Sequence, residues 1–352
     1  MRIVVVGGGL VGTCFALEAE ARGAHVTIVE RTGLHAEAST AGAGILGADA
    51  ESLTGDHVAH DAIAAREAMF AWLPALEART GLSARAARRG TLVLPRDEAE
   101  RATYTGWLAR HPHSGTWIDA AALAELQPAL AACPLGAVLF EADGSLEPAR
   151  YGSAVTAALR GTSVDVRCGV GASGVIAEGG AARGVRLEDG SELRGDVVVI
   201  AAGAWSRALL AAVGIDDPIA PLRGQLLELR PARDEVRPVV FEGKRYIVPR
   251  GDGRYVIGST MEHVGFDRDV TESARRDLLA FAERVVPAFA GAEVVAHWCG
   301  FRPFRPSGPR VGATAVPGLY TSFGHGRDGI LFSRKSALDL AKALALPEPA
   351  PV

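Results

Sequence analysis

The first thirty residues, MRIVVVGGGLVGTCFALEAEARGAHVTIVE, constrain the fold of this chain more than any other stretch. The β-branched apolar run at 3–6 predicts a short strand that is covered by helices on both faces. Three glycines follow it at once. Gly7 permits a tight turn, Gly9 has no Cβ to keep a pyrophosphate away, and Gly12 lets the next helix pack close to the strand. This helix begins with backbone N–H groups and a dipole that favour an anion.

A second predicted strand at 26–29 ends in Glu30. A carboxylate at this place, about 20 residues beyond the glycines, can accept hydrogen bonds from both hydroxyls of an adenosine ribose. The order of strand, turn, helix, strand and acid therefore favours a dinucleotide site over a glycine-rich turn in an ordinary α/β protein. NAD and FAD share the ADP half, so this stretch alone leaves both cofactors open.

Length and charge exclude several classes of protein. A chain of 352 residues has room for two domains or one large one, and its net charge of -4 gives no reason to expect nucleic acid or an anionic membrane as a partner. The N-terminus enters a strand directly, and no apolar run of roughly 18 residues exists, so we expect a cytoplasmic protein. The cysteines lack metal-binding spacing, and we expect them to be buried: Cys14, Cys133, Cys168 and Cys299.

Three later segments resemble the opening one in their small residues. The run at 38–47 has no helical or strand period, and the predicted buried strand at 196–201 leads into Ala202 and Gly203, with Ser206 as a candidate helix cap. A predicted strand at 319–323 is followed by Gly324, Gly326, Gly329 and a helix at 331–344. A second glycine turn before a helix could face the C2=O and N1 side of a reduced flavin, which favours FAD over NAD.

The remaining segments predict a second domain that interrupts the first. We predict an α/β fold in which a Rossmann-like FAD-binding domain, assigned to 1–83, 141–218 and 298–346, carries an antiparallel-sheet substrate domain at 84–140 and 219–297. Residues 347–352 form a tail. Helices are expected at 56–80, 97–110, 119–126, 149–160 and 271–286, and strands at 89–95, 137–140, 224–230, 246–249 and 255–258. In the first of these helices Trp72 is expected in the core, with flavin stacking as the alternative.

Several motifs together resemble the D-amino acid oxidase superfamily, and within it the glycine oxidases of thiamine biosynthesis. They are the opening fingerprint, AGAGILGADAE at 41–51, YIVPR at 246–250, GSTM at 258–261, GFRP at 300–303 and GHGRDGI at 324–330. The likeness covers about residues 1–345. It implies a fold of the glutathione-reductase and D-amino acid oxidase type.

The resemblance implies an oxidase of small amines. In such enzymes noncovalent FAD oxidises the amine of glycine, sarcosine or a small D-amino acid to an imine by hydride transfer from the α-carbon. Water hydrolyses the imine to an oxo acid and ammonia, and oxygen is reduced to hydrogen peroxide. No side chain has to act as a general base, so positioning and cofactor tuning carry the catalysis. A homo-oligomer is compatible with this assignment.

The resemblance also implies site roles. Arg302 would clamp the substrate carboxylate, Tyr246 would donate its hydroxyl to it, Met261 would line the side-chain pocket, and Arg327 would lie between flavin and substrate. The competing interpretations are a surface arginine and core packing of the tyrosine and methionine, and His325 is expected to be structural. The residues expected to bind FAD are Gly7, Gly9, Leu10, Val11, Gly12, Glu30, Arg31, Ser39, Ala43, Gly44, Ile45, Leu46, Val170, Ala202, Gly203, Trp205, Gly300, Arg302, His325, Gly326, Arg327, Asp328, Gly329 and Ile330.

Three departures from the family pattern bear on the substrate. Lys244 replaces an expected histidine and indicates either a second anionic substrate group or a solvated loop lysine, the reading we favour. Arg334 and Lys335 stand where the family often has an apolar stretch. The sequence therefore does not decide where the helix on the flavin side begins. Cys299 raises the possibility of a covalent flavin, but the motif around it differs from that of the sarcosine oxidases.

Other functions are weighed against the oxidase. A dehydrogenase of the same fold would pass electrons to another acceptor, and a related oxidase would act on another N-substituted glycine or an aminophosphonate. A tRNA-modifying flavoprotein would need a basic face, which this sequence lacks. A nicotinamide-dependent dehydrogenase and an inactive flavin-binding module are the last two alternatives.

Overall fold

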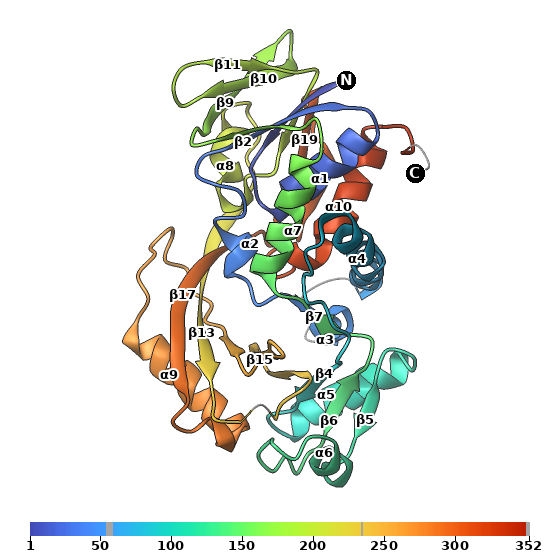
Figure 1. Cartoon of the computed structure of the whole chain (residues 1–352), viewed down its shortest axis with the longest axis vertical. Coiled ribbons are helices and arrows are strands. Elements are labelled where there is room, and N and C mark those ends of the chain that lie inside the picture. The colour runs from blue at the N-terminus through green and yellow to red at the C-terminus, as the bar shows by residue number, and fades with distance from the viewer. Residues whose placement is uncertain (54–58, 234, 350–352) are drawn as a thin grey trace.

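The computed structural model describes residues 1–53, 59–233 and 235–349. Two large sheets lie one beyond the other along the long axis of the molecule, and the long strands β13 (Ala220–Arg230) and β17 (Glu293–Phe304) run from the junction into the lower sheet (Figure 1). The upper half contains the N-terminus and a layer of helices. The lower half is built mainly from the middle of the chain.

The upper sheet has six strands in the order β18-β19-β12-β1-β2-β8. Its strands pair in parallel except for the antiparallel edge pair of β18 and β19. The apolar run of β1 forms a strand because all four of its residues from Ile3 to Val6 are buried between the covering layers. The strands are β1 (Arg2–Val6), β2 (His25–Glu30), β8 (Asp165–Cys168), β12 (Val197–Ile200), β18 (Arg310–Ala313) and β19 (Leu319–Phe323).

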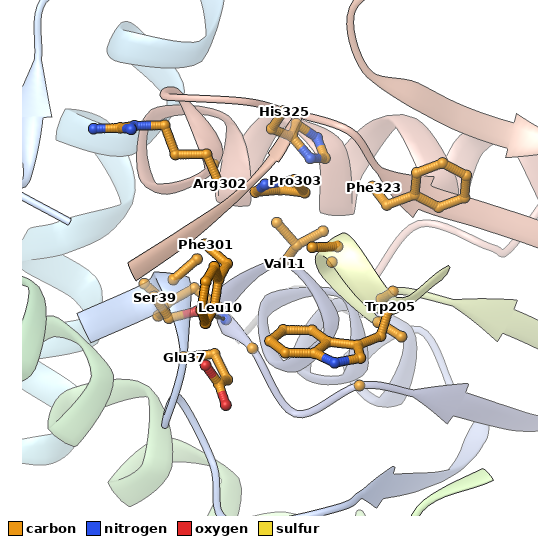
Figure 2. Close-up of a pocket in the computed structure, with 18 of the residues that line it drawn as sticks. Leu10, Val11, Glu37, Ser39, Trp205, Phe301, Arg302, Pro303, Phe323 and His325 are labelled. Carbon is orange, nitrogen blue, oxygen red and sulfur yellow. Dashed lines mark hydrogen bonds between the residues drawn. The ribbon is translucent and has the colours of Figure 1, made fainter. Parts of the chain in front are cut away.

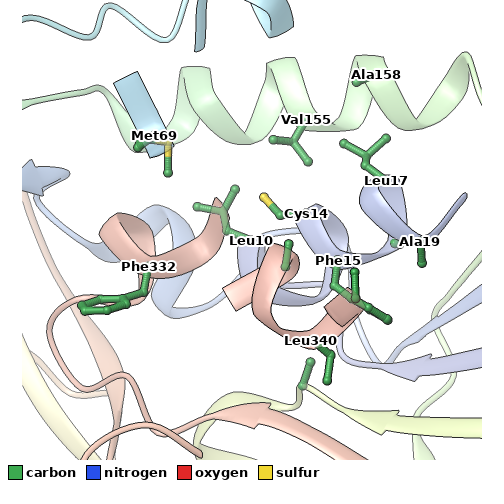
Figure 3. Packing of buried hydrophobic residues seen from close by; sticks show 14 of the residues in the cluster. Leu10, Cys14, Phe15, Leu17, Ala19, Met69, Val155, Ala158, Phe332 and Leu340 are labelled. Carbon is green, nitrogen blue, oxygen red and sulfur yellow. The ribbon is translucent and has the colours of Figure 1, made fainter. Parts of the chain in front are cut away.

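Helices from distant parts of the sequence cover one face of this sheet. Helix α1 packs against α7 and α10, and α4 packs against α7 and α10. Figure 3 shows how Leu10 and Cys14 of α1 meet Met69, Val155 and Phe332 from the other three helices. The bounds are α1 (Leu10–Ala21), α4 (Ala59–Thr80), α7 (Pro148–Arg160) and α10 (Gly329–Ala343).

The lower sheet has eight strands in the order β17-β13-β16-β15-β14-β4-β6-β5. It is antiparallel as predicted, with one parallel pair between β14 and β4. Apolar clusters lie on both of its faces. Its other elements are β4 (Thr91–Leu94), α5 (Glu98–Arg110), β5 (Thr116–Ile118), α6 (Ala120–Leu126), β6 (Ala137–Phe140), β14 (Val239–Glu242), β15 (Arg245–Pro249), β16 (Tyr255–Gly258), α9 (Glu272–Val285) and η2 (Pro287–Phe289).

Short elements complete the fold. A three-stranded sheet in the order β11-β10-β9 lies at the outer end of the upper half (Figure 1). The small-residue run that was expected to lack regular structure contains α2 and the two-residue strand β3. The bounds are α2 (Ala38–Ala41), β3 (Ile45–Leu46), α3 (Ala48–Leu53), β7 (Gly144–Ser145), β9 (Ala172–Glu178), β10 (Ala181–Leu187), β11 (Glu192–Arg194), η1 (Gly203–Trp205) and α8 (Ser206–Ala211).

The predicted fold class is confirmed, with local corrections. Ser206 does not cap α8, because its hydroxyl donates to the carbonyl of Gly203 in the preceding turn. Cys168 is exposed on the edge strand β8 and only Cys14 is fully buried. The predicted domain boundary at 297/298 falls inside β17, and residues 56–58 of the first long predicted helix lie outside the described residues.

No helix in the described ranges combines the length and the apolar character that crossing a membrane would need. The described residues also contain no group of three or more histidine, cysteine or carboxylate side chains arranged to hold a metal ion.

Candidate active site

A cavity lies between the two halves of the molecule. It has a volume of about 430 Å³ and is lined by residues of both large sheets. Figure 2 shows Leu10, Val11 and Trp205 toward one part of the cavity and Pro303 and His325 across from them, while the Arg302 side chain extends away from this group. The predicted residues that line it are Gly7, Gly9, Leu10, Val11, Glu30, Arg31, Ser39, Ala43, Gly44, Ile45, Ala202, Gly203, Trp205, Tyr246, Gly300, Arg302, His325, Gly326, Arg327, Gly329 and Ile330.

The first glycines form a tight cradle at one end of the cavity. Gly7 has a φ of +116°, and a Cβ there would lie 2.3 Å from the carbonyl oxygen of Ala201. A Cβ on Gly12 would lie 2.2 Å from the Gly7 carbonyl oxygen, so α1 packs directly on the turn. At Gly9 a Cβ would meet only the Ser39 hydroxyl, 3.2 Å away. The N-terminus of α1 is therefore accessible from the cavity, as an anion site requires.

Glu30 is held in place beside this cradle. Its Oε2 accepts a hydrogen bond of 2.8 Å from the Gly8 amide, and its Oε1 accepts one of 2.9 Å from the Thr32 amide. Each carboxylate oxygen can accept more than one hydrogen bond, so acceptor capacity remains for a ribose. The neighbouring Arg31 places its guanidinium 5.0 Å from the centre of the Trp205 ring.

The second glycine turn lies across the cavity from the first. Helix α10 begins at Gly329, two residues earlier than predicted, and Gly326 donates its amide to the Pro303 carbonyl. His325 is buried there and its Nε2 lies 2.8 Å from the Ser336 hydroxyl. Burial lowers the pKa of His325 to about 4, so this ring is neutral near pH 7. Its hydrogen bond fits the predicted structural role.

Arg302 occupies the other end of the cavity. Its Nη1 donates a hydrogen bond of 3.1 Å to the Thr260 carbonyl, and its Nη2 donates to the Ser259 hydroxyl. Both acceptors are neutral, and within the described chain no carboxylate forms an ion pair with this guanidinium. Desolvation by burial lowers the pKa of Arg302, while Tyr246 raises it. A partly buried cation with further N–H donors is thus available for an anionic ligand.

Three side chains surround Arg302. Tyr246 is buried on β15, and its ring lies over Gly258 of β16, where a Cβ would be 2.4 Å from Cε2. The Arg327 guanidinium lies 5.8 Å from the centre of that ring. The Nε of Arg327 is 3.6 Å from Oε2 of Glu51, which reaches the cavity from α3. This end of the cavity therefore contains two guanidinium groups, one carboxylate and one phenol.

Five predicted residues do not line the cavity. Gly12 and Leu46 lie behind the residues that line the cavity. Gly12 lets α1 pack closely on the first glycine turn, and Leu46 belongs to the hydrophobic core of the upper half. Asp328 is the residue before α10, and Val170 packs in an apolar cluster while residues 171–173 line the cavity in its place. Met261 is 46% exposed on the loop after β16, so the structure does not support its predicted place in a side-chain pocket.

The unusual residues lie away from the cavity lining. Lys244 is exposed in the β14–β15 turn, which agrees with a solvated loop lysine. Arg334 is paired with Glu18 of α1 at 2.5 Å and lies over the Trp72 ring, and Lys335 pairs with Asp339. Trp72 itself packs against the upper core. Cys299 does not line the cavity, and its sulfur donates to the Arg268 carbonyl.

Sequence reasoning did not select two residues of the site. Glu51 is the last residue of the segment 41–51, which is one of the motifs that resemble the family. The motif therefore includes Glu51, but it does not predict a role for this residue. Gly224 lies beneath the Arg302 guanidinium, where a Cβ would be 2.2 Å from Nη1. The sequence around Gly224 contains no signal for this contact.

Comparison with known proteins identifies the family. The sequence profile of the FAD-dependent oxidoreductases named DAO matches residues 2–343. The chain belongs to this family. A glycine oxidase of Pseudomonas aeruginosa is 32% identical over 99% of this chain and 96% of its own length. A bifunctional ThiO/ThiG protein of Nostoc is 30% identical over 96% of this chain and 52% of its own length.

Solved structures of this family of FAD-dependent oxidoreductases agree with the architecture. The crystal structure of glycine oxidase from Geobacillus kaustophilus superposes with a TM-score of 0.93 at 28% identity, and the match covers 99% of this chain and 96% of that one. An iminodiacetate oxidase from Chelativorans has the same fold, with a TM-score of 0.85 at 23% identity over 99% of this chain and 97% of that one.

The cavity residues fit FAD, the cofactor of the family. The open backbone at Gly9 and the helix N-terminus behind it suit the pyrophosphate, and Glu30 suits the adenosine ribose. The second glycine turn and the start of α10 line the same cavity as Arg302. Their backbone N–H groups would be available to the isoalloxazine ring of FAD. The protein is therefore an FAD-dependent oxidoreductase whose own residues agree with its cofactor.

Proposed function

We propose that this protein oxidises the amine of glycine or a similar small amino acid to an imine, with oxygen as the electron acceptor. One observation carries the substrate class. The partly buried Arg302 lines the cavity, donates hydrogen bonds to two neutral acceptors, and has no carboxylate partner in the described residues. A planar fork of this kind binds both oxygens of an α-carboxylate and thereby orients the α-carbon.

The relatives support the same substrate. The first curated relatives are glycine oxidases that match almost the whole chain, and the crystal structure with a TM-score of 0.93 is also a glycine oxidase. The ThiO/ThiG relatives support a role in thiamine biosynthesis. We further propose that the enzyme is cytoplasmic. We also propose that it binds FAD without a covalent bond, because none of the cysteines lines the described cavity.

The residues of this chain position the substrate and exclude water. FAD, when bound, supplies the acceptor for the two electrons removed from the amine. Arg302 holds the carboxylate, and the Tyr246 hydroxyl is close enough to Arg302 to donate to the same group. Tyr246 is buried and Arg302 is partly buried, so the carboxylate would lie where the dielectric constant is lower than in water and charge-assisted hydrogen bonds are stronger. The site thus works by holding the α-carbon in one orientation.

Replacing the clamp tests the proposal. Arg302→Ala should retain FAD but lose about 2–5 kcal/mol of carboxylate binding, because a buried hydrogen-bonded charge pair is lost. Arg302→Lys keeps the charge without the planar fork and should recover only part of the glycine affinity. Flavin bleaching by glycine under nitrogen reports the reduction, and peroxide release in air reports the acceptor. Unchanged glycine turnover in Arg302→Ala would contradict the assignment, and brisk dye reduction without peroxide would indicate a dehydrogenase.

A further inference from the structure

The loop that joins β16 to α9 contacts the wall of the cofactor cavity from the lower half of the molecule. Phe266 of this loop stacks on the Trp205 ring, with centroids 4.6 Å apart and an angle of 19° between the ring planes. Phe266 also meets the Phe301 ring edge-on, at 5.4 Å between centroids. Its side chain is 43% exposed. The ring contacts of Phe266 are thus made with two residues that line the cavity.

Arg268 makes a second contact of this kind from the same loop. Its Nη2 donates a hydrogen bond of 2.7 Å to Oε1 of Glu37, which also lines the cavity. Its guanidinium carbon lies 5.1 Å from the centre of the Phe301 ring. Figure 2 shows Glu37, Phe301 and Trp205, the three lining residues that the loop contacts. Phe266 and Arg268 do not line the cavity themselves, and we call these two residues the outer brace.

The loop that carries the outer brace is anchored on β13. Arg223 of this strand is buried, and its guanidinium donates to the carboxylates of Glu262 and Asp267, at 2.9 and 2.7 Å. It also donates to the carbonyl of Asp269, at 2.8 Å. Separating a buried arginine from its carboxylate partners is strongly unfavourable, so this part of the loop stays on β13. The outer brace therefore has a fixed base.

The two elements of the upper half that the outer brace contacts are short. Trp205 ends the three-residue η1, and Glu37 directly precedes the four-residue α2. Helical segments of this length are not stable alone, so their positions depend on contacts with the rest of the molecule. Segments with few such contacts open locally more often than the core does. A cofactor in the cavity would be released faster if these two segments opened more often.

We propose that the outer brace slows the release of FAD from the holoenzyme. Its two side chains act as positioning residues, because they hold Trp205 and Glu37 in place from the other half of the molecule. This inference goes beyond the proposed function, since it concerns the cofactor and requires no particular substrate.

The rate of FAD release tests the role of Phe266. The holoenzyme is diluted, and release is followed by the rise in the fluorescence of free flavin. Phe266→Ala should release FAD about threefold to tenfold faster than the wild type, because an aromatic pair with the cavity wall is lost. Phe266→Tyr keeps the ring and should release FAD at the wild-type rate.

The ion pair of Arg268 is tested in the same way. Arg268→Gln should release FAD about twofold to fivefold faster, since an exposed ion pair contributes little stability. Its difference from the wild type should shrink in about 1 M sodium chloride, where exposed charges are screened. Glu37→Gln/Arg268→Gln should release FAD at nearly the same rate as Glu37→Gln alone, because the first substitution already breaks the pair.

Two control variants separate this role from a general loss of stability. Val264→Ala shortens another apolar side chain of the same loop, 41% exposed, that is not part of the outer brace. Asp97→Ala removes the cap of α5, outside the cavity lining. Both should release FAD at the wild-type rate.

The inference is overturned if Phe266→Ala and Arg268→Gln release FAD at the wild-type rate, or if Asp97→Ala accelerates release as much as they do. If Phe266→Ala cannot be loaded with FAD, Arg268→Gln alone decides. The measurement contains no substrate, so either result leaves the proposed oxidation of glycine to its own test.

Discussion

The guanidinium group of Arg302 fills the space that a side chain on Gly224 would occupy. A Cβ on residue 224 would lie 2.2 Å from Nη1 and 2.4 Å from Cζ of Arg302. The two residues are on the paired strands β13 and β17, whose register places Leu222 opposite Arg302 and Gly224 opposite Gly300. The position of the proposed carboxylate clamp thus depends on a glycine in the neighbouring strand.

Gly224→Ala should displace the clamp without disturbing the cofactor end. We expect kcat/KM for glycine to fall by about tenfold to a hundredfold, because small displacements of positioning groups have large kinetic effects. FAD content, measured from the absorbance ratio, should stay at the wild-type value. Gly174→Ala is the matched control, since a Cβ on that strand residue would contact nothing within 4 Å. Wild-type kinetics in Gly224→Ala would show that the clamp does not need this position.

The contact between Gly224 and Arg302 also shows where sequence reasoning ends. The roles of Gly7, Gly9 and Glu30 could be predicted because the strand, turn, helix and second strand follow one another within thirty residues. Gly224 and Arg302 meet only through the register of two long strands, and Glu51 meets Arg327 only because α3 and the second glycine turn converge. Neither pair has a local pattern that predicts it.

Two predicted site residues, Met261 and Val170, do not line the described cavity. The GSTM motif at 258–261 predicts a pocket role for Met261, but the conformation of the loop after β16 leaves its side chain exposed. Val170 was placed at the cofactor, while residues 171–173 line the cavity. The preceding strand β8 is exposed at all four residues, so it lacks the apolar run from which a buried strand can be predicted.

Alanine substitutions at Gly7 and Gly9 should have different effects. Gly7→Ala would place a methyl group 2.3 Å from the Ala201 carbonyl at a φ of +116°, so it should destabilise even the apoprotein. Gly9 has φ near -71°, and a methyl group there would meet only the Ser39 hydroxyl, so Gly9→Ala should change apoprotein stability by less than about 0.5 kcal/mol. It should nevertheless weaken FAD binding, because its methyl group enters the pyrophosphate cradle. Thermal unfolding measures the stability of each apoprotein variant, and FAD titration measures its affinity for the cofactor. If Gly7→Ala and Gly9→Ala changed both quantities equally, the predicted difference between the two glycines would be wrong.

Asp143→Ala should destabilise the protein by about 3–5 kcal/mol, because it leaves Arg66 with one partner less in a buried site and removes the cap of α3. Denaturant unfolding measures this loss. Asp97 caps α5 at the surface through the Glu100 amide, so Asp97→Ala should cost only about 1 kcal/mol. Similar losses in the two variants would mean that the Arg66 bridge contributes little beyond the cap.

Two buried histidines predict a loss of stability in mild acid. Burial lowers the pKa of both His35 and His325 to about 4, against an ordinary value of 6.5 in the unfolded chain. Between these values the unfolded chain binds protons that the folded chain does not, so stability falls as the pH drops from 6.5 toward 4. Each histidine contributes a slope of at most about 1.4 kcal/mol per pH unit.

Two carboxyl groups titrate in different ranges, and one of them overlaps with the histidines. Burial raises the pKa of Asp143 to about 6, so this group binds its proton more readily in the folded chain and its contribution opposes that of the histidines as the pH falls below 6. Arg254 lowers the pKa of Asp252 to about 2, so the stability that this ion pair contributes is lost mainly below the ordinary aspartate value of 3.8. Urea unfolding of the FAD-loaded protein at several pH values from 4.5 to 7.5 measures the sum of the histidine and Asp143 contributions, and replacing a single histidine isolates its share. His35→Asn should flatten this dependence whatever its effect on absolute stability, whereas the exposed His113→Asn should leave the slope unchanged. A slope that His35→Asn does not alter would mean that His35 binds its proton in the folded protein.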